Sequence, residues 1–186
     1  MRQIIAVCVL AMTLFLAGCI ADVTTKTPLQ PETSVAGDEK LLGCWQQVEE
    51  KDTLALFSKY NEHMLKMTFF DKSATMVFYA QPSKIGTRQM LSFKSCKIEG
   101  ERPEFADYGL ISYEAGEDSL TLSFTNPEEW GSAIKAKTIQ GRISKQTGEK
   151  ADEVQLDESP EKLASFLAAG DLKKLFSREM KFKKVK

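Results

Sequence analysis

From residue 41 to the end of the chain, apolar and polar side chains alternate mostly with a period of two, as in half-buried β-strands. The clearest run is 119–125, where Leu120, Leu122 and Phe124 alternate with threonine and serine. Polar breaks separate the runs, so each is expected to pair antiparallel with the next one along the chain. The pattern predicts about eight short strands, near 42–48, 65–69, 74–80, 91–95, 108–113, 119–125, 134–143 and 180–185.

Two segments have helical spacing instead. Residues 53–62 predict a short helix that covers one end of the strands. Ser159 and Pro160 are residue types that favour a helix N-cap and first position, and Gly170 ends the apolar periodicity. The fold class is therefore mainly β. We expect an antiparallel up-and-down barrel or strongly curved sheet of about eight strands, with a C-terminal helix packed on it, because closure removes exposed strand edges.

The N-terminal segment has the three parts of a secretory signal: a basic start, a short apolar centre and small residues before a break. Arg2 is the only charge before Asp22, and the apolar run 4–16 is shorter than the roughly twenty residues that a membrane-spanning helix needs. Leu16-Ala17-Gly18-Cys19 resembles the lipobox of bacterial lipoproteins. The resemblance implies that the signal is cut before Cys19, which carries a diacylglycerol thioether and an acylated amino group. The alternative is an ordinary cleavable signal with an incidental cysteine.

This resemblance divides the chain into a signal peptide at 1–18, a lipidated cysteine with a flexible tether at 19–38, and a β domain at 39–186. Residues 20–38 contain two prolines and four threonines and have no apolar period. In lipoproteins, an Asp beside the lipidated cysteine favours the inner membrane. Ile20 stands there in this chain, so we expect an outer-membrane anchor through acylated Cys19 and a domain on the periplasmic face.

The cysteines predict a disulfide. Cys8 leaves with the signal and Cys19 is acylated, so Cys44 and Cys96 remain, and two such cysteines in an oxidising compartment usually pair. The prediction conflicts with a plain meander, in which the first and fourth strands are not neighbours. A disulfide requires Cα atoms within about 7 Å of each other. Either the bridge joins the ends of loops, or the strand order is not that of a simple barrel.

We expect no nucleic-acid partner. A formal net charge of −1 gives no electrostatic attraction to nucleic acid, and the expected export argues against such a partner independently. The charges are nevertheless uneven: residues 149–161 are mostly acidic and residues 173–186 mostly basic. The basic C-terminal end is either a solvated strand or a surface that touches anionic lipid or an acidic partner.

One tripeptide supports the barrel. Gly43-Cys44-Trp45 resembles the Gly-x-Trp opening of lipocalin-like (calycin) barrels. The resemblance implies that Trp45 plugs the closed end of the barrel. It also implies that a basic residue near the last strand, Arg178 or Lys181, packs on the Trp45 ring by a cation–π contact.

Residues for catalysis are sparse, and we expect no enzyme, no cofactor and no metal. His63 is the only histidine, and it has no zinc-type spacing to neighbouring acids. Trp130, in a predicted loop, either caps the core or anchors a partner. Inward apolar residues could instead line a pocket for an acyl chain, although such residues more often fill a core; they are Met67, Phe69, Phe78, Phe93 and Phe124.

Two functions follow. In the first, the barrel of an outer-membrane lipoprotein binds a small hydrophobic or envelope-derived ligand. In the second, the domain is a non-catalytic envelope protein-interaction module, an inhibitor or assembly factor, that acts through loops and the basic C-terminal tail. A continuous internal cavity would favour the first function, and a filled barrel would favour the second.

Overall fold

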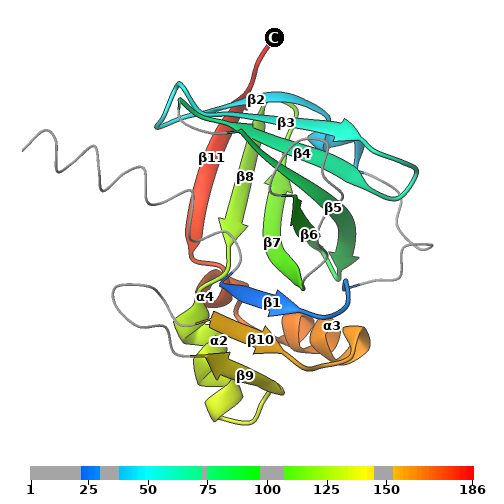
Figure 1. Ribbon diagram of the computed structural model, residues 1–186, viewed down its shortest axis with the longest axis vertical. Helices are drawn as coiled ribbons and strands as arrows, with labels where there is room; N and C mark the ends of the chain where they lie inside the picture. The colour runs from blue at the N-terminus through cyan, green and yellow to red at the C-terminus, as the bar shows by residue number, and fades with distance from the viewer. Residues whose placement is uncertain (1–21, 30–37, 73–74, 97–106, 145–152) are drawn as a thin grey trace, which may run out of the picture.

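The structure is a computed structural model that describes residues 22–29, 38–72, 75–96, 107–144 and 153–186. Eight strands form a closed barrel (Figure 1), in which β11 pairs with both β8 and β2, and β6 pairs with β7. All of these pairings are antiparallel, which confirms the predicted fold class. The barrel strands are β2 (Gly43–Gln47), β3 (Leu54–Lys59), β4 (Leu65–Phe70), β5 (Thr75–Ile85), β6 (Arg88–Cys96), β7 (Tyr108–Ala115), β8 (Ser119–Phe124) and β11 (Arg178–Lys184).

The alternation read from the sequence places one apolar face of each strand inside the barrel. On β8, Leu120, Leu122 and Phe124 are buried, and the serines and threonine between them are not. Since inward side chains from every barrel strand meet in one apolar cluster, burial of that cluster is the main force that closes the sheet.

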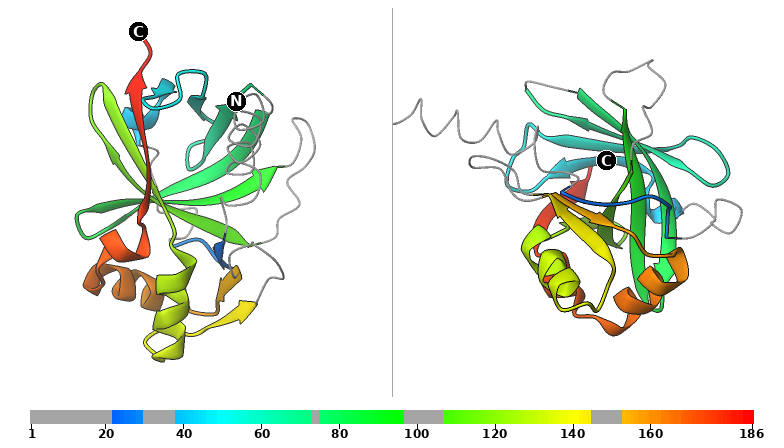
Figure 2. Two further views of the ribbon diagram at one scale, coloured as in Figure 1. Left: turned by 90° about the vertical axis from the view of Figure 1, so that its left-hand side faces the viewer. Right: turned by 60° about the horizontal axis from the view of Figure 1, so that its bottom comes forward.

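The chain leaves the barrel after β8 and returns as β11, and the segment between them builds, together with β1 from the start of the described chain, a cap at one end of the barrel. Figures 1 and 2 show the cap elements together below the barrel. They surround a second apolar core. The cap elements are β1 (Val23–Thr25), α2 (Pro127–Lys135), β9 (Gly141–Ser144), β10 (Glu153–Leu156), α3 (Pro160–Ala169) and α4 (Leu172–Leu175).

Part of the predicted tether belongs to this cap. β1 pairs antiparallel with β7 and parallel with β10, and Val23 is fully buried. Leu29 is buried as well, and its backbone N–H donates to the Ser92 hydroxyl oxygen. The sequence hid this strand because it is only three residues long, and its pairing partners lie far along the chain. The tether prediction is therefore wrong for residues 22–29.

The helix predicted over 53–62 is also wrong, because Leu54–Lys59 form strand β3. Ala55 and Phe57 face the barrel core, whereas Leu56 lies on the outer face and is 38% exposed. Apolar residues on both faces of the strand concealed its period of two.

The strand predicted over 134–143 is wrong in its first half. Residues 127–135 form α2: the Asn126 side chain accepts a hydrogen bond from the Glu128 backbone N–H, and Pro127 occupies the first turn. β9 begins only at Gly141. By contrast, α3 agrees with its prediction, since Ser159 caps its start and Gly170 ends it.

Candidate functional site

The five residues proposed to line a ligand pocket lie together in the barrel core, where none is more than 7% exposed. The Phe78 ring centroid lies 5.9 Å from that of Phe69 and 5.5 Å from that of Phe93, and both pairs are nearly perpendicular. Edge-to-face pairs of this kind stabilise a core by about 0.5–1.5 kcal/mol each. Met67 and Phe124 belong to the same cluster. These side chains pack against one another, and none of them lines the grooves described below.

Trp45 is fully buried inside the barrel, and its indole N–H donates to the Leu41 carbonyl at 2.8 Å. The cation on its ring is Lys184, whose Nζ lies 5.0 Å from a ring centroid of Trp45. The resemblance to lipocalin-like barrels implies Arg178 or Lys181 in this position, and that prediction is wrong. Lys184 lies directly opposite Trp45 in the β11–β2 register. Lys181 is an odd number of residues away from Lys184, so its side chain lies on the other face of β11, and Arg178 lies at the opposite end of that strand.

Gly43 leaves room for the Lys184 side chain. Its φ of +124° is a conformation that other L-residues rarely adopt, and a Cβ atom there would stand 3.1 Å from Lys184 Cε. The glycine therefore allows the Lys184 side chain to cross the strand and reach the Trp45 ring.

The predicted disulfide is not present in the structure, because Cys44 is a free, half-buried cysteine. The strand order explains why. In the eight-stranded ring β2 and β6 stand opposite each other, with three strands between them on either side. Neighbouring strands lie about 4.8 Å apart, so Cys44 on β2 is beyond the reach of Cys96 on β6. The side chain of Cys96 lies outside the described residues, as does Cys19.

Two other residues singled out in the sequence have structural positions. Trp130 is buried in the cap core, and its indole N–H donates to the Leu175 carbonyl at 3.1 Å, so it caps the core. His63 lies in the turn between β3 and β4. Among the described residues, no group of three or more His, Cys, Asp or Glu side chains is placed to hold a metal ion.

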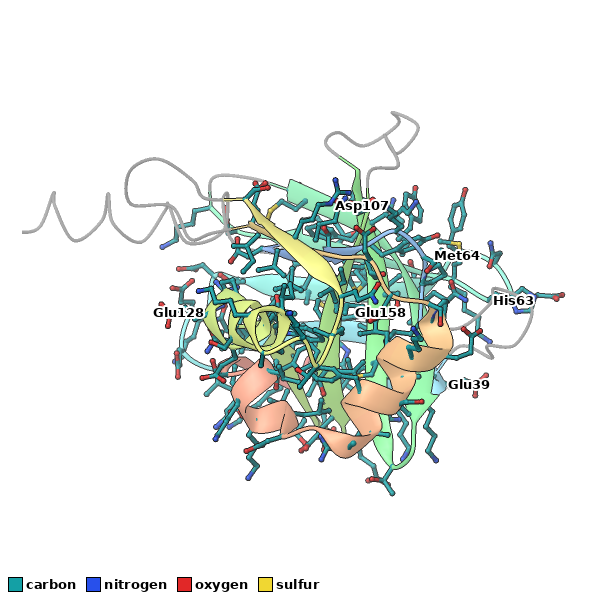
Figure 3. All side chains as sticks on the ribbon, turned by 90° about the horizontal axis from the view of Figure 1, so that it is seen from below. Glu39, His63, Met64, Asp107, Glu128 and Glu158 are labelled. Carbon is teal, nitrogen blue, oxygen red and sulfur yellow. The ribbon has the colours of Figure 1, made fainter. Side chains whose placement is uncertain are left out.

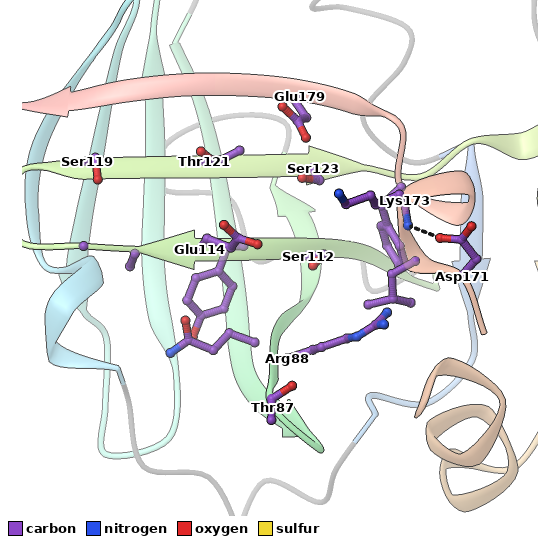
Figure 4. Close-up of a pocket in the computed structure, with 16 residues that line it drawn as sticks. Thr87, Arg88, Ser112, Glu114, Ser119, Thr121, Ser123, Asp171, Lys173 and Glu179 are labelled. Atoms are coloured by element: carbon purple, nitrogen blue, oxygen red, sulfur yellow. Dashed lines mark hydrogen bonds between the residues drawn. The ribbon is translucent and has the colours of Figure 1, made fainter. Parts of the chain in front are cut away.

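A groove with a volume of about 720 Å³ runs along the outer wall of the barrel. We call it the wall groove. The outward faces of β7, β8 and β11 form its floor, and the β5–β6 turn and α4 form its end (Figure 4). Its lining residues are Thr87, Arg88, Gln89, Ser112, Tyr113, Glu114, Ala115, Gly116, Ser119, Thr121, Ser123, Asp171, Leu172, Lys173, Phe176 and Glu179.

Short hydroxyl side chains cover the floor of the wall groove. Ser112 on β7 lies opposite Ser123 on β8, and Ser123 lies opposite Glu179 on β11. One step along the strands, Glu114 lies opposite Thr121. Figure 4 shows these side chains on the same face of the sheet. The floor thus offers hydroxyl groups that donate and accept hydrogen bonds, with carboxylates beside them.

Cations lie at the α4 end of the groove. Arg88 and Lys173 line it there, and the Arg88 Nη1 atom is buried without a hydrogen-bond partner among the described residues. A buried donor left unpaired costs about 1–3 kcal/mol, and more when it is charged. The Arg88 side chain itself lines the groove, so its positive charge is placed to attract a carboxylate of a molecule bound there. Asp171 is already engaged, because its side chain accepts from the Lys173 backbone N–H at 3.1 Å.

A hydrogen-bond network lies behind the groove wall, where the inward-facing Tyr113 belongs to the barrel core. Gln89 Nε2 and the Tyr113 hydroxyl both donate to Asp38 Oδ2, at 2.6 and 3.2 Å. Burial, reinforced by the negative charge of Asp38, raises the pKa of Tyr113 well above its ordinary value. The phenol therefore stays neutral and holds its place as a donor. Asp38 Oδ1 also accepts from the Lys40 backbone N–H, which ties the segment before β2 to the wall.

Arg178 and Asp22 form a second polar centre, between the barrel and the cap. Arg178 Nη2 lies 3.0 Å from Asp22 Oδ2, and its Nε and Nη2 donate to the Thr125 carbonyl at 3.2 and 3.0 Å. Burial raises the pKa of Asp22 above its ordinary value, although the Arg178 charge opposes that shift. A groove of about 700 Å³, which we call the Asp22 groove, opens beside this pair along α2.

Comparison of the chain with protein-family models, with curated proteins and with solved structures finds no match. In the part of the chain that the structure describes, no helix is long and apolar enough to cross a membrane.

Sequence reasoning missed the wall groove. The small polar residues of 119–125 mark one outer face, but the cross-strand register that places Ser112 and Glu179 beside them cannot be read from local pattern. Arg88 carries no signal in the sequence, because its unusual feature is a buried, unpaired nitrogen.

Proposed function

We propose that the mature protein is a lipoprotein of the outer membrane, anchored through acylated Cys19 and facing the periplasm, whose barrel domain is a non-catalytic module for binding another envelope protein. The wall groove takes an extended segment of that partner. The observation that carries this proposal is a hydroxyl-lined groove with the cations Arg88 and Lys173 at one end and Glu114 on its floor. A carboxylate of the partner pairs with Arg88, and a basic side chain of the partner lies near Glu114.

The packing of the barrel favours this function over transport of an apolar ligand. The five apolar side chains once expected to face a ligand fill the interior with mutual contacts. The wall groove is polar and carries charges of both signs, which suits a peptide segment better than an acyl chain.

Site-directed photo-crosslinking in living cells tests the groove. A photoreactive side chain at Ser123 should capture one envelope protein, whereas the same group at Ala168, exposed on α3, should not. Arg88→Met should reduce the Ser123 adduct about tenfold or more, because a charge-assisted hydrogen bond contributes about 1.5–3 kcal/mol. Arg88→Lys, which keeps the charge, should restore part of it. Adducts that are unaffected by Arg88→Met would contradict the proposal.

Fractionation tests the anchor separately. Cys19→Ala should release the protein into the periplasm as a soluble domain, because no acyl chain remains to hold it. Ile20→Asp is the matched control: it keeps the lipid and should move the protein to the inner membrane. Recovery of the Cys19→Ala protein with outer membranes would contradict lipid anchoring.

A further inference from the structure

The position of β1 limits how far the domain can stand from an anchor at Cys19. Cys19 precedes Asp22 by three residues, and three residues span at most about 11 Å when fully extended. A domain of this length has a radius of gyration of about 15 Å. The connection is therefore shorter than the radius of the body that it holds, so the domain cannot turn freely on the membrane.

Asp22 is a fixed point on that body. It is only 6% exposed, its side chain pairs with Arg178, and its carbonyl oxygen accepts from the Val154 backbone N–H at 2.7 Å. The next residues, Val23–Thr25, are held between β7 and β10. Because the chain is fixed from Asp22 onward, the acylated cysteine lies close to one particular face of the domain.

We propose that this face, formed by Asp22, Arg178 and the exposed side of α2, rests on the lipid headgroups of the membrane. The inference rests on the proposed anchor at Cys19. The Asp22 groove opens on this face, and the exposed side chains of Lys135 and Glu128 line it beside the Asp22–Arg178 pair. Charges of both signs complement the phosphate and ammonium groups of zwitterionic phospholipids. The membrane surface is thus an occupant that both the chain length and the charges fit.

Figure 3 shows the side of the domain that we place on the membrane and the side that we place away from it. Glu128, on α2 beside the Asp22 groove, lies on one side, and His63 and Glu39 lie on the opposite side. Glu128 should therefore be near the membrane and His63 far from it. This difference in distance can be measured.

The experiment uses the lipidated full-length protein with Cys44→Ser and Cys96→Ser, on vesicles of phosphatidylethanolamine and phosphatidylglycerol that contain a headgroup nitroxide lipid. A fluorophore is attached to Glu128→Cys in one sample and to His63→Cys in the other. We expect the Glu128 probe to be quenched at least threefold more strongly than the His63 probe. Twenty Gly/Ser residues inserted after Ala21 have an r.m.s. length of roughly 25 Å and should abolish the difference while the protein still floats with the vesicles.

The outcomes separate the two proposals. Flotation with equal quenching of the two probes, or a difference that survives the insertion, would overturn the orientation and leave the anchor intact. A protein that does not float with the vesicles would overturn the anchor at Cys19 and the orientation with it.

Discussion

Replacing Phe78 by Ala tests whether the barrel is packed or hollow. Phe78 is 4% exposed and makes edge-to-face contacts with Phe69 and Phe93. Truncating a ring that neighbours surround on both sides removes its burial and leaves a cavity, which costs about 3–5 kcal/mol. Urea unfolding of the soluble domain, followed by tryptophan fluorescence, measures the loss. If the Phe78→Ala domain does not fold, Phe78→Leu is measured instead and should show a smaller loss of unfolding free energy.

The matched control is Phe70→Ala on the same barrel wall. Phe70 ends β4 and is 37% exposed, so its removal should cost less than about 1 kcal/mol. In a hollow barrel the Phe78 ring would face empty space or ligand, and its truncation would cost little more than the control. A loss below about 1.5 kcal/mol for Phe78→Ala, with Phe70→Ala unchanged, would refute the packed interior.

Three further predictions concern the ends of the barrel and its cysteines. Lys184→Met should lower the unfolding free energy by about 0.5–2 kcal/mol and alter Trp45 fluorescence, because the cation over the ring is lost; an unchanged spectrum would count against the contact. The folded-state pKa of Asp22 is raised, so the native state holds the Asp22 proton more tightly than the unfolded state does. The unfolding free energy of the wild type should therefore fall relative to that of Asp22→Asn as pH rises from about 4 to 7. A wild-type unfolding free energy that rises relative to that of Asp22→Asn over this range would contradict the prediction. Thiol labelling of the unfolded, unreduced domain should find both Cys44 and Cys96 reactive, because β2 and β6 are opposite strands; protection of both would restore the disulfide.

The parts of the fold with strong local signals could be predicted from the sequence. The strand 119–124 alternates cleanly, and the helix after Ser159 has a cap, a first-turn proline and a terminating glycine. Each of these signals acts within a few residues, so no knowledge of the tertiary fold is needed to interpret it.

Features that depend on distant pairing could not be predicted. β1 is a strand because β7 and β10 lie on either side of it, and Lys184 meets Trp45 because β11 pairs with β2 in one particular register. Leu54–Lys59 carry apolar residues on both faces, so their periodicity was ambiguous until burial separated the two faces. Each of these features is fixed by contacts between segments far apart in the chain.

Native mass spectrometry of the Cys19→Ala domain, purified gently from the periplasm, distinguishes a filled barrel from one that holds a ligand. The central claim is that the barrel interior is filled by its own side chains and that binding takes place outside it. We expect the mass of the bare chain without its signal and no co-purifying apolar molecule. An apolar mass that is lost when a bulkier residue replaces Met67 would show that the interior holds a ligand, and would contradict the account.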